Sequence, residues 1–339
     1  MSQSLIINIG IFFVATAIIA IVGTKMTKIA DRLADKTGLG EAVVGALFLG
    51  GSTSLPGIVT SVSAAWSGHP QLAIANAIGG IAAQTAFLAI ADIVYPRANL
   101  EHAAASVANL LQGTLLVSLL AIPLLATASP EVSLFGFHPA SIALIGTYIF
   151  GLSLVKEAKT TPMWKPEETA TTSLDEPDES YSGGSLTKIL LRFFILTAIV
   201  GVAGYLVSRS GIAIAQETGL SETVVGALFT AVATSLPELV TSIAAVKQGA
   251  LTLAVGGIIG GNSFDVLFVA FSDIAYRGGS IYHAITNSHI FSISLTILMT
   301  GILVMGLLRR EKHGVGNIGF ESFLVLLLYT GGVLMLFFN

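Results

Sequence analysis

The chain carries one stretch twice, and this internal repeat constrains its fold more than any other feature of the sequence. Residues 39–95 align with residues 220–276 without a gap, at a constant offset of 181 positions, and 27 of the 57 aligned pairs are identical. Thr53-Ser-Leu-Pro56 recurs as Thr234-Ser-Leu-Pro237. A duplication of this length predicts two equivalent halves, with the functional residues lying where the two copies meet.

The composition is that of a membrane protein. Hydrophobic residues make up 53% of the 339 residues, charged residues make up 11%, and the mean hydropathy is +0.84. Soluble domains carry about 25% charged residues. The 36 glycines suit helices that approach one another closely in a bilayer. The chain contains no cysteine, which excludes disulfides and thiolate chemistry, and no basic patch indicates a nucleic-acid partner.

Apolar segments of spanning length predict an all-α polytopic protein with ten transmembrane helices. The first segment is interpreted as a retained span, because it lacks a basic region before the apolar run and a clear cleavage site. The ten predicted spans are residues 4–24, 41–66, 70–95, 103–127, 138–155, 188–208, 221–246, 250–275, 283–307 and 317–338.

The basic residues predict the orientation of these spans. With alternating sides, 14 of the 16 Lys and Arg residues fall on one side, which is therefore expected to face the cytoplasm of a prokaryotic cell. Both termini are then outside. Each half holds five spans, an odd number, so residues 1–155 and 188–339 are predicted to form inverted repeats. Residues 156–187 are polar and are expected to form a flexible cytoplasmic linker, whose acidic cluster is interpreted as a solvated connector.

Chemistry-bearing residues concentrate in the second copy. Glu238 lies in an apolar segment where a carboxylate is costly, and Pro237 removes a backbone donor from the same helix. Thr234 lies four residues before Glu238 and is expected on the same helical face. The next span carries Asn262 and Asp265 after a run of glycines. Carboxylates, hydroxyls and freed carbonyls form an all-oxygen site that suits hard cations such as Ca²⁺ or Na⁺.

The first copy lacks the charges. It keeps Thr53 and Ser54, but Gly57 stands at the position of Glu238 and Gln84 at that of Asp265. The predicted site is therefore asymmetric. The other polar residues within spans have two possible roles, one in helix packing or at the membrane interface and one in ion binding or proton transfer. These residues are Asn76, Asp92, Asp273 and His289.

Thr234-Ser-Leu-Pro-Glu238 followed by Gly260-Gly-Asn-Ser-Phe-Asp265, echoed in the first half, resembles the alpha-repeats of sodium/calcium exchangers, members of the calcium/cation antiporter superfamily. The resemblance implies that the first and sixth spans slide past the other eight during transport. It also implies that the cation site is lined by Thr53, Ser54, Thr234, Ser235, Glu238 and Asp265. Gln84 and Asn262 complete the candidate cation-binding set, in which Glu238, Asp265, Thr53 and Thr234 are the expected metal ligands.

Several positions depart from that family's pattern. Gly57 replaces a glutamate, Gly80 and Gly261 stand where a serine is usual, and Ile81 and Gln84 stand where an asparagine is usual. The site therefore holds at most two negative charges, enough for one Ca²⁺ but poorly suited to three Na⁺. Coupling to fewer sodium ions, or to protons through a buried carboxylate, stays open.

The sequence thus predicts a secondary active antiporter that exchanges Ca²⁺ for Na⁺ or H⁺ by alternating access. Inorganic cations and the lipid bilayer are the expected partners, with no cofactor and no obligatory protein partner. A monovalent cation/proton antiporter, a non-coupled cation channel and an exchanger that no longer transports remain alternatives. No sequence motif of an intramembrane enzyme is present, so enzymatic function is not expected.

Overall fold

The structure is a computed structural model, and the residues it describes form helices and no strand. These residues are 3–26, 28–29, 51–95, 98–104, 106–134, 136–163, 165–167, 185–249, 251–312, 314 and 318–338. The helices are α1 (Gln3–Ile18), η1 (Ile19–Gly23), α4 (Gly51–Trp66), α5 (Pro70–Val94), α6 (Leu100–Ala103), α7 (Val107–Thr127), α8 (Pro139–Thr160), α9 (Leu186–Thr218), α10 (Glu222–Val224), η3 (Val225–Thr230), α11 (Ala231–Thr234), α12 (Leu236–Gln248), α13 (Leu251–Asp265), α14 (Leu267–Ala275), η4 (Ile281–Ala284), α15 (Asn287–Arg309) and α16 (Phe320–Phe338).

Within the described residues, eight helical segments are long and apolar enough to cross a membrane, and a bent pair of helices supplies a ninth. Of the predicted span 41–66, only the part that forms α4 lies within the described residues. The middle of the predicted linker also lies outside them. The helix that contains the predicted sixth span is longer than that span, because α9 continues to Thr218 and stops at Gly219, which has a left-handed φ of 76°.

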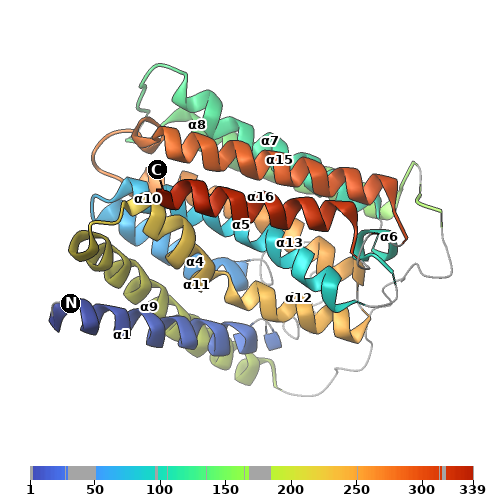
Figure 1. Ribbon diagram of the computed structural model, residues 1–339, viewed down its shortest axis with the longest axis horizontal. Coiled ribbons are helices and arrows are strands. Elements are labelled where there is room, and N and C mark those ends of the chain that lie inside the picture. The colour runs from blue at the N-terminus through green and yellow to red at the C-terminus, as the bar shows by residue number, and fades with distance from the viewer. Residues whose placement is uncertain are drawn as a thin grey trace.

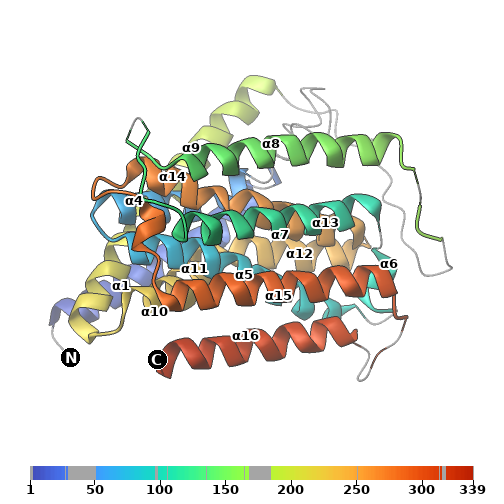
Figure 2. The same cartoon turned by 90° about the horizontal axis from the view of Figure 1, so that it is seen from above.

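Two spans form the centre of the bundle. In the most apolar windows of Pro70–Val94 and Ala254–Ala275, 78% of the residues are buried, against 22% near the N-terminus and 17% in α9. Helices α1 and α9 pack against each other on one flank, and α9 also packs against α4 (Figure 1). Seen from above, α8 and α16 lie on opposite sides of the bundle (Figure 2). The start of α1 and the end of α16 lie at the same end (Figures 1 and 2).

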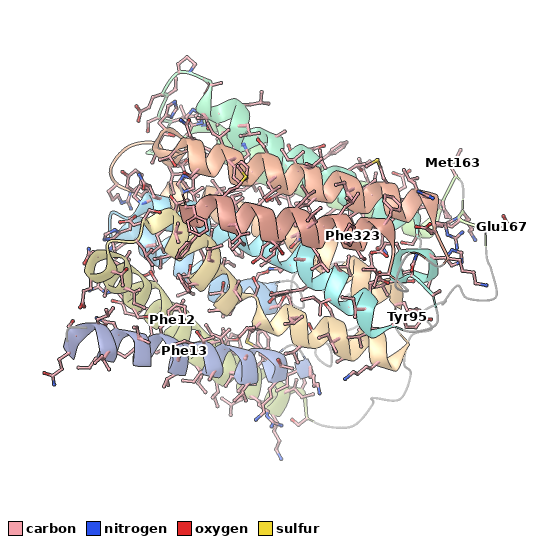
Figure 3. The ribbon with its side chains drawn as sticks, in the orientation of Figure 1. Phe12, Phe13, Tyr95, Met163, Glu167 and Phe323 are labelled. Atoms are coloured by element: carbon pink, nitrogen blue, oxygen red, sulfur yellow. The ribbon has the colours of Figure 1, made fainter. Side chains whose placement is uncertain are left out.

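Many large apolar side chains point outward from the peripheral helices, among them Phe13 on α1 and Phe323 on α16 (Figure 3). A soluble protein rarely exposes apolar surface to this extent. Lipid contacts satisfy these side chains at no such cost, so the protein is a multi-pass helical membrane protein.

Glycines set the close approach of the central helices. A Cβ atom added to Gly79 on α5 would lie 2.6 Å from the Cα of Ala227 on η3. A Cβ at Gly226 would lie 2.6 Å from the Cβ of Ala75. The two helices can therefore touch backbone to backbone, as small residues allow in membranes.

The second copy of the repeated segment is broken where the first is continuous. Helix α11 ends at Thr234, Ser235 leaves the helical region at φ −96° and ψ 5°, and the chain bends by 44° into α12. Pro237 has no N–H to donate to the carbonyl of Ala233, which weakens the helix next to the break. A second interruption separates α13 from α14 at Val266. In the first copy, α4 passes through Pro56, and α5 has no interruption.

Asp273 joins the two halves of the chain at one end of the bundle. Its carboxylate accepts hydrogen bonds from the backbone N–H groups of His138 (2.7 Å) and Ile281 (3.0 Å) and from the Ser141 hydroxyl (2.7 Å). His138 precedes the first residue of α8, so a residue of the second half caps the last helix of the first half.

Asp92 makes the equivalent contacts at the opposite end. It accepts hydrogen bonds from the N–H groups of Leu100 (2.7 Å) and Gly319 (3.1 Å) and from the side chain of Ser322. Each of these four positions lies 181 residues from its counterpart around Asp273. The first half therefore caps α16 in the second half. Asp92 and Asp273 thus serve to join helices, the role that their positions near span ends favour.

Candidate cation site

Asp265, at the end of α13, is the point where the two copies of the repeat meet. The Ser54 hydroxyl on α4 donates to its Oδ1 at 2.5 Å, and the Gln84 amide on α5 donates to its Oδ2 at 2.7 Å. The same Gln84 Nε2 lies 3.2 Å from the hydroxyl of Ser235, at the break between α11 and α12. All four side chains are buried. Four predicted site residues from four different elements are thus in direct contact.

Glu238 lies in the first turn of α12 and is 6% exposed. The Thr53 side chain hydrogen-bonds its carboxyl group, and the charge of Asp265 acts on it. Its Oε2 atom accepts no hydrogen bond from any residue that the structure describes. The break at Ser235 lies between Thr234 and Glu238, so the helix that carries both residues is interrupted next to Pro237.

Among the candidate site residues, three buried acceptor oxygens lack a hydrogen-bond donor from the described part of the chain: Oε2 of Glu238, Oε1 of Gln84 and Oδ1 of Asn262. An unsatisfied buried acceptor costs free energy of about 1–3 kcal/mol. A bound cation would satisfy acceptor oxygens, whereas it would be repelled by donors. The donor set is therefore chemically suited to a cation bound through oxygen.

Thr234 and Asn262 contact different neighbours from the Asp265 group. The Thr234 hydroxyl donates to the backbone carbonyls of Thr230 (2.9 Å) and Ala231 (3.2 Å), which leaves its lone pairs available. The Asn262 amide donates to the hydroxyl of Thr85 at 3.1 Å. The structure shows no hydrogen bond from either residue to Glu238 or Asp265.

Within the described part of the chain, no group of three His, Cys, Asp or Glu residues is arranged to hold a metal ion. The candidate site therefore depends on two carboxylates complemented by neutral oxygens.

The missing carboxylate of the first copy is explained by packing. A Cβ atom added to Gly57 would lie 2.6 Å from the ring carbon Cε2 of Phe268, which is buried. Phe268 also packs edge-on against Phe264, with ring centroids 6.3 Å apart. A glutamate at position 57 has no room while Phe268 keeps this position.

Asn76 connects three elements beside the site. Its amide donates to Ser61 Oγ (2.9 Å) and to the carbonyl of Gly57 (3.3 Å), while its Oδ1 accepts from Thr230 at 2.7 Å. Sequence reasoning missed Thr230, Ser61 and the Thr85 partner of Asn262. Thr230 could have been found from its spacing of four residues from Thr234.

Two histidines have partners outside this cluster. His289 caps α15 through the backbone N–H and hydroxyl of Thr286, and its other ring nitrogen lies 3.0 Å from the carbonyl of Gln71. These contacts fit a packing role for His289. His69 forms an ion pair with Glu222 at 2.5 Å, a contact between the two copies that the sequence did not reveal.

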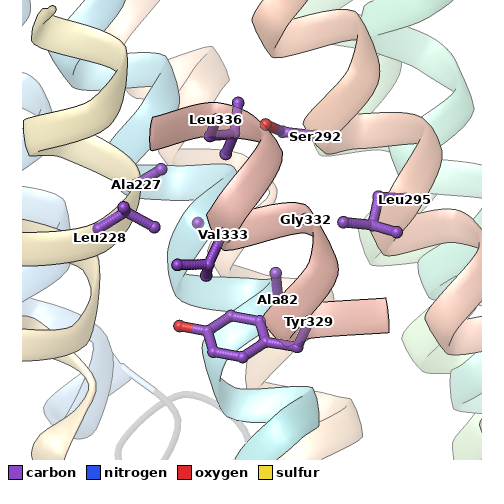
Figure 4. A pocket seen from close by; sticks show the side chains of 10 residues that line it. Ala82, Ala227, Leu228, Ser292, Leu295, Tyr329, Gly332, Val333 and Leu336 are labelled. Carbon is purple, nitrogen blue, oxygen red and sulfur yellow. The ribbon is translucent and has the colours of Figure 1, made fainter. Parts of the chain in front are cut away.

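A shallow pocket between α5, η3, α15 and α16 is separate in character from the cation site (Figure 4). Its walls are apolar, and its polar side chains are Ser292 and Tyr329. It contains no carboxylate and offers no cation chemistry.

A helical membrane protein with buried, clustered carboxylates between two homologous segments is a transporter rather than an enzyme. A family model described as sodium/calcium exchanger protein matches residues 7–156 and 188–338. The chain belongs to this family, whose members are cation antiporters.

Individual relatives agree with that assignment. Inner membrane protein YrbG of Escherichia coli is 25% identical over 311 residues, covering 90% of this chain and 92% of its own length. Sodium/calcium exchanger MaX1 of Methanosarcina acetivorans is 32% identical over 157 residues, covering 45% of this chain and 44% of its own. A solved structure of the sodium-calcium exchanger NCX_Mj, soaked with Na⁺ and Sr²⁺, matches with a TM-score of 0.60 at 21% identity, covering 97% of this chain and 99% of that one. This last likeness concerns the fold.

Proposed function

We propose that the protein exchanges Ca²⁺ for Na⁺ or H⁺ across a prokaryotic cytoplasmic membrane, using one site that faces each side in turn. Glu238, Asp265, Thr53 and Thr234 are the proposed metal ligands, with Ser54, Ser235, Gln84 and Asn262 completing the site. The observation that carries the proposal is the contact of the Asp265 carboxylate with Ser54 and Gln84, since it joins the charged copy to the neutral copy.

The charge of the site sets the stoichiometry. Two carboxylates neutralise one Ca²⁺ or two monovalent ions, so we propose exchange of one Ca²⁺ for two Na⁺ or two H⁺. Such exchange moves no net charge. A binding site whose carboxylates are neutralised by bound ions costs less free energy in the low-dielectric interior than a site with a net charge. Only the transporter with a neutralised site is therefore expected to change the side of the membrane to which the site opens.

Glycine contacts support a sliding motion of α1 and α9. A Cβ atom at Gly23, the last residue of η1, would lie 2.7 Å from Pro237, and a Cβ at Gly204 on α9 would lie 2.8 Å from the carbonyl of Pro56. Gly23 and Gly204 are 181 positions apart, as are the two prolines. Each flanking helix thus presents a glycine to one of the two proline segments, which suits movement of the pair past them.

The proposed architecture has ten spans in two inverted five-helix repeats, residues 1–155 and 188–339, with a cytoplasmic linker at 156–187 and both termini outside. The matched caps formed by Asp92 and Asp273 support two equivalent halves. The location of both chain ends at one end of the bundle supports an even number of spans (Figure 1).

Uptake of radiolabelled Ca²⁺ into proteoliposomes tests the proposal, with an outward Na⁺ gradient and a pH gradient applied in parallel. Uptake above the external concentration with either gradient is expected, and the gradient that works identifies the coupling ion. Uptake that is independent of both gradients and never exceeds equilibrium would instead indicate a channel. Absence of uptake under all conditions would contradict Ca²⁺ exchange.

A monovalent cation/proton antiporter is the second candidate. The position of Phe268 against Gly57 favours this candidate, because it leaves no room for a third carboxylate in the site. Proteoliposomes that acidify or alkalinise on addition of Na⁺ or K⁺, but take up no Ca²⁺, would establish this alternative.

A further inference from the structure

Helix α6 and the start of α16 lie at the same end of the bundle (Figure 1). Three carboxylates, those of Asp92, Glu101 and Glu321, lie close to one another there. Asp92 is 0% exposed, and Glu101 and Glu321 are each 1% exposed. The charges of Asp92 and Glu321 both act on Glu101. By the distribution of basic residues, this end of the bundle is predicted to face the cytoplasm. None of the three belongs to the candidate cation site.

The carboxyl groups of Glu101 and Glu321 lie within hydrogen-bonding reach of each other. Among the described residues, no N–H or O–H group donates to Glu101 Oε2 or to either carboxyl oxygen of Glu321. The Glu321 side chain lies against two glycines, since a Cβ at Gly306 would meet its Cγ and a Cβ at Gly319 would meet its carboxyl group. Two carboxyl groups in contact need a cation between them, because two carboxylates repel.

Among the described residues, the basic groups near the pair contact other partners and do not provide that cation. On α6, His102 Nδ1 lies 2.6 Å from the carbonyl of Arg310. The Arg310 guanidinium donates to the carbonyls of Glu167 and His102. Arg309 pairs with Glu311 at 3.5 Å and lies over the ring of Phe320. Lys312 contacts α6 through its backbone carbonyl, which accepts from Asn99.

A proton fits the pair better than a metal ion does. No group of three acidic or imidazole side chains within the described residues is arranged for a metal, and the Asp92 carboxylate already accepts hydrogen bonds from Leu100, Gly319 and Ser322. Burial raises the pKa of Glu101 well above its ordinary value, and the charges of Asp92 and Glu321 raise it further. A carboxyl group under these conditions keeps its proton at neutral pH.

The other end of the bundle shows that the cap does not require this acidic pair. Around Asp273, the positions equivalent to Glu101 and Glu321 are Tyr282 and Ala140, at the same offset of 181. Asp273 nevertheless makes the same three hydrogen bonds as Asp92. The pair is therefore an addition to one end of a symmetric framework.

We propose that Glu101 and Glu321 form a proton-binding site that holds α6 against the start of α16. With one shared proton, the protonated carboxyl donates to the carboxylate and the pair carries one negative charge. When that proton leaves to water, the pair carries two negative charges beside Asp92, and their repulsion loosens the contact of α6 with α16. The site thus makes the conformation of this end sensitive to the pH on its own side of the membrane.

Infrared difference spectra of the purified protein, recorded while the pH is raised, test the site directly. We expect the C=O band of a protonated carboxyl group to disappear in the wild type. This band should be absent from Glu101→Gln and Glu321→Gln, apart from the band of the new amide. It should be unchanged in Glu131→Gln, a control variant of the same residue type at the opposite end of the bundle. A double variant, Glu101→Tyr with Glu321→Ala, reproduces the opposite end and covers the case in which a glutamine variant fails to fold.

Thermal unfolding across the same pH range provides a second readout. A carboxyl group whose folded pKa is raised stabilises the fold fully below its ordinary pKa, and this stability is lost as pH rises through the folded pKa. The wild-type Tm should therefore fall as the pH rises, and the double variant should show a smaller fall.

Two results would overturn the proposal. One is a set of carboxyl bands in the double variant identical to that of the wild type, which would place the proton elsewhere. The other is a rise in wild-type Tm on addition of Ca²⁺ or Mg²⁺ that Glu101→Gln abolishes and Glu238→Gln does not, which would make this a metal site. Neither result depends on the proposed exchange activity, so the proton site and the transport proposal fail separately.

Discussion

The two copies of the repeated segment share their proline but differ in what surrounds it. Pro56 lies inside the helix α4, whereas Pro237 follows a break and a 44° bend at Ser235. The first copy supplies hydroxyl and amide groups to the candidate site, and the second supplies both carboxylates. In its described residues 51–95, the first copy therefore contributes only neutral groups to the candidate site, from helices α4 and α5.

This difference shows how the two copies of a duplicated membrane segment can contribute different chemical groups to one site. Breaking a helix in hydrocarbon exposes backbone groups, and burying a carboxylate there is costly, so both costs are tolerated only where a partner compensates them. The hydroxyl of Ser54 and the amide of Gln84 provide that compensation for Asp265. Within the described residues, the candidate site thus takes its carboxylates and its broken helix from the second copy.

The largest effect is expected from removing the charges of the second copy. Glu238→Gln and Asp265→Asn should each lower Ca²⁺ uptake at least about 100-fold, which corresponds to roughly 3 kcal/mol for a lost buried charge. Proteoliposome uptake measures this effect. Glu222→Gln, which alters the same residue type in the ion pair with His69, is the matched control and should leave uptake unchanged. Retained uptake in both site variants would disprove the site.

The next prediction gives the first copy the charge that it lacks. Gly57→Glu should destabilise the protein by about 1–3 kcal/mol, because the new side chain meets the ring of Phe268. Combining it with Phe268→Ala should remove the clash and add a third carboxylate, so that Ca²⁺ exchange becomes sensitive to the membrane potential. Thermal unfolding and uptake at a clamped potential, with Phe268→Ala alone as control, measure both effects. A fully stable Gly57→Glu single variant would show that packing does not exclude the carboxylate.

A smaller difference should separate two serines at equivalent positions. Ser54 donates to the Asp265 carboxylate, whereas Ser235 accepts from the neutral Gln84 amide. Hydrogen bonds to charged groups contribute roughly 2 kcal/mol and neutral ones about 1 kcal/mol. Ser54→Ala should therefore weaken Ca²⁺ affinity about 30-fold and Ser235→Ala about 5-fold. Equal losses of Ca²⁺ affinity in titrations of the two variants would show that the two serines do not differ in function.

The smallest effect on transport is expected at the two helix caps. Asp92→Asn and Asp273→Asn should leave Ca²⁺ affinity unchanged but lower the free energy of unfolding by about 1–3 kcal/mol. The free energy of unfolding should fall less in Asp92→Asn than in Asp273→Asn, because the loss of the Asp92 charge also relieves repulsion with Glu101 and Glu321. Thermal unfolding compares the two variants at one pH. A larger loss for Asp92→Asn would show that these acids do not repel one another.

Much of the fold follows from the sequence because a segment that crosses the hydrocarbon core of a bilayer must be apolar and must satisfy its own backbone hydrogen bonds. The described helices occupy nine of the ten predicted spans and part of the tenth, with ends that differ by up to ten residues, as at α9. The pattern of apolar residues locates a span, but it does not say where a helix continues beyond the bilayer. Gly219, with its left-handed backbone, decides that end.

The site was predictable in its members but not in its contacts. Glu238 and Asp265 stand out because carboxylates are rare in apolar spans, and the repeat identifies Gln84 as the equivalent of Asp265. The bond from Ser54 to Asp265 joins residues 211 positions apart, and sequence spacing carries no information about it. The position of Phe268 against Gly57 is equally invisible before the helices pack.

The sequence by itself determined that this is a duplicated, all-helical membrane protein with an asymmetric pair of carboxylates, since composition, periodicity and internal identity are properties of the chain alone. Only the tertiary structure decided which neutral groups satisfy those carboxylates, where Phe268 excludes a third, and that Asp92 and Asp273 cap helices of the opposite half. Hydrogen bonding and packing act over a few ångströms, so their partners are set by how the two copies dock and not by their order along the chain.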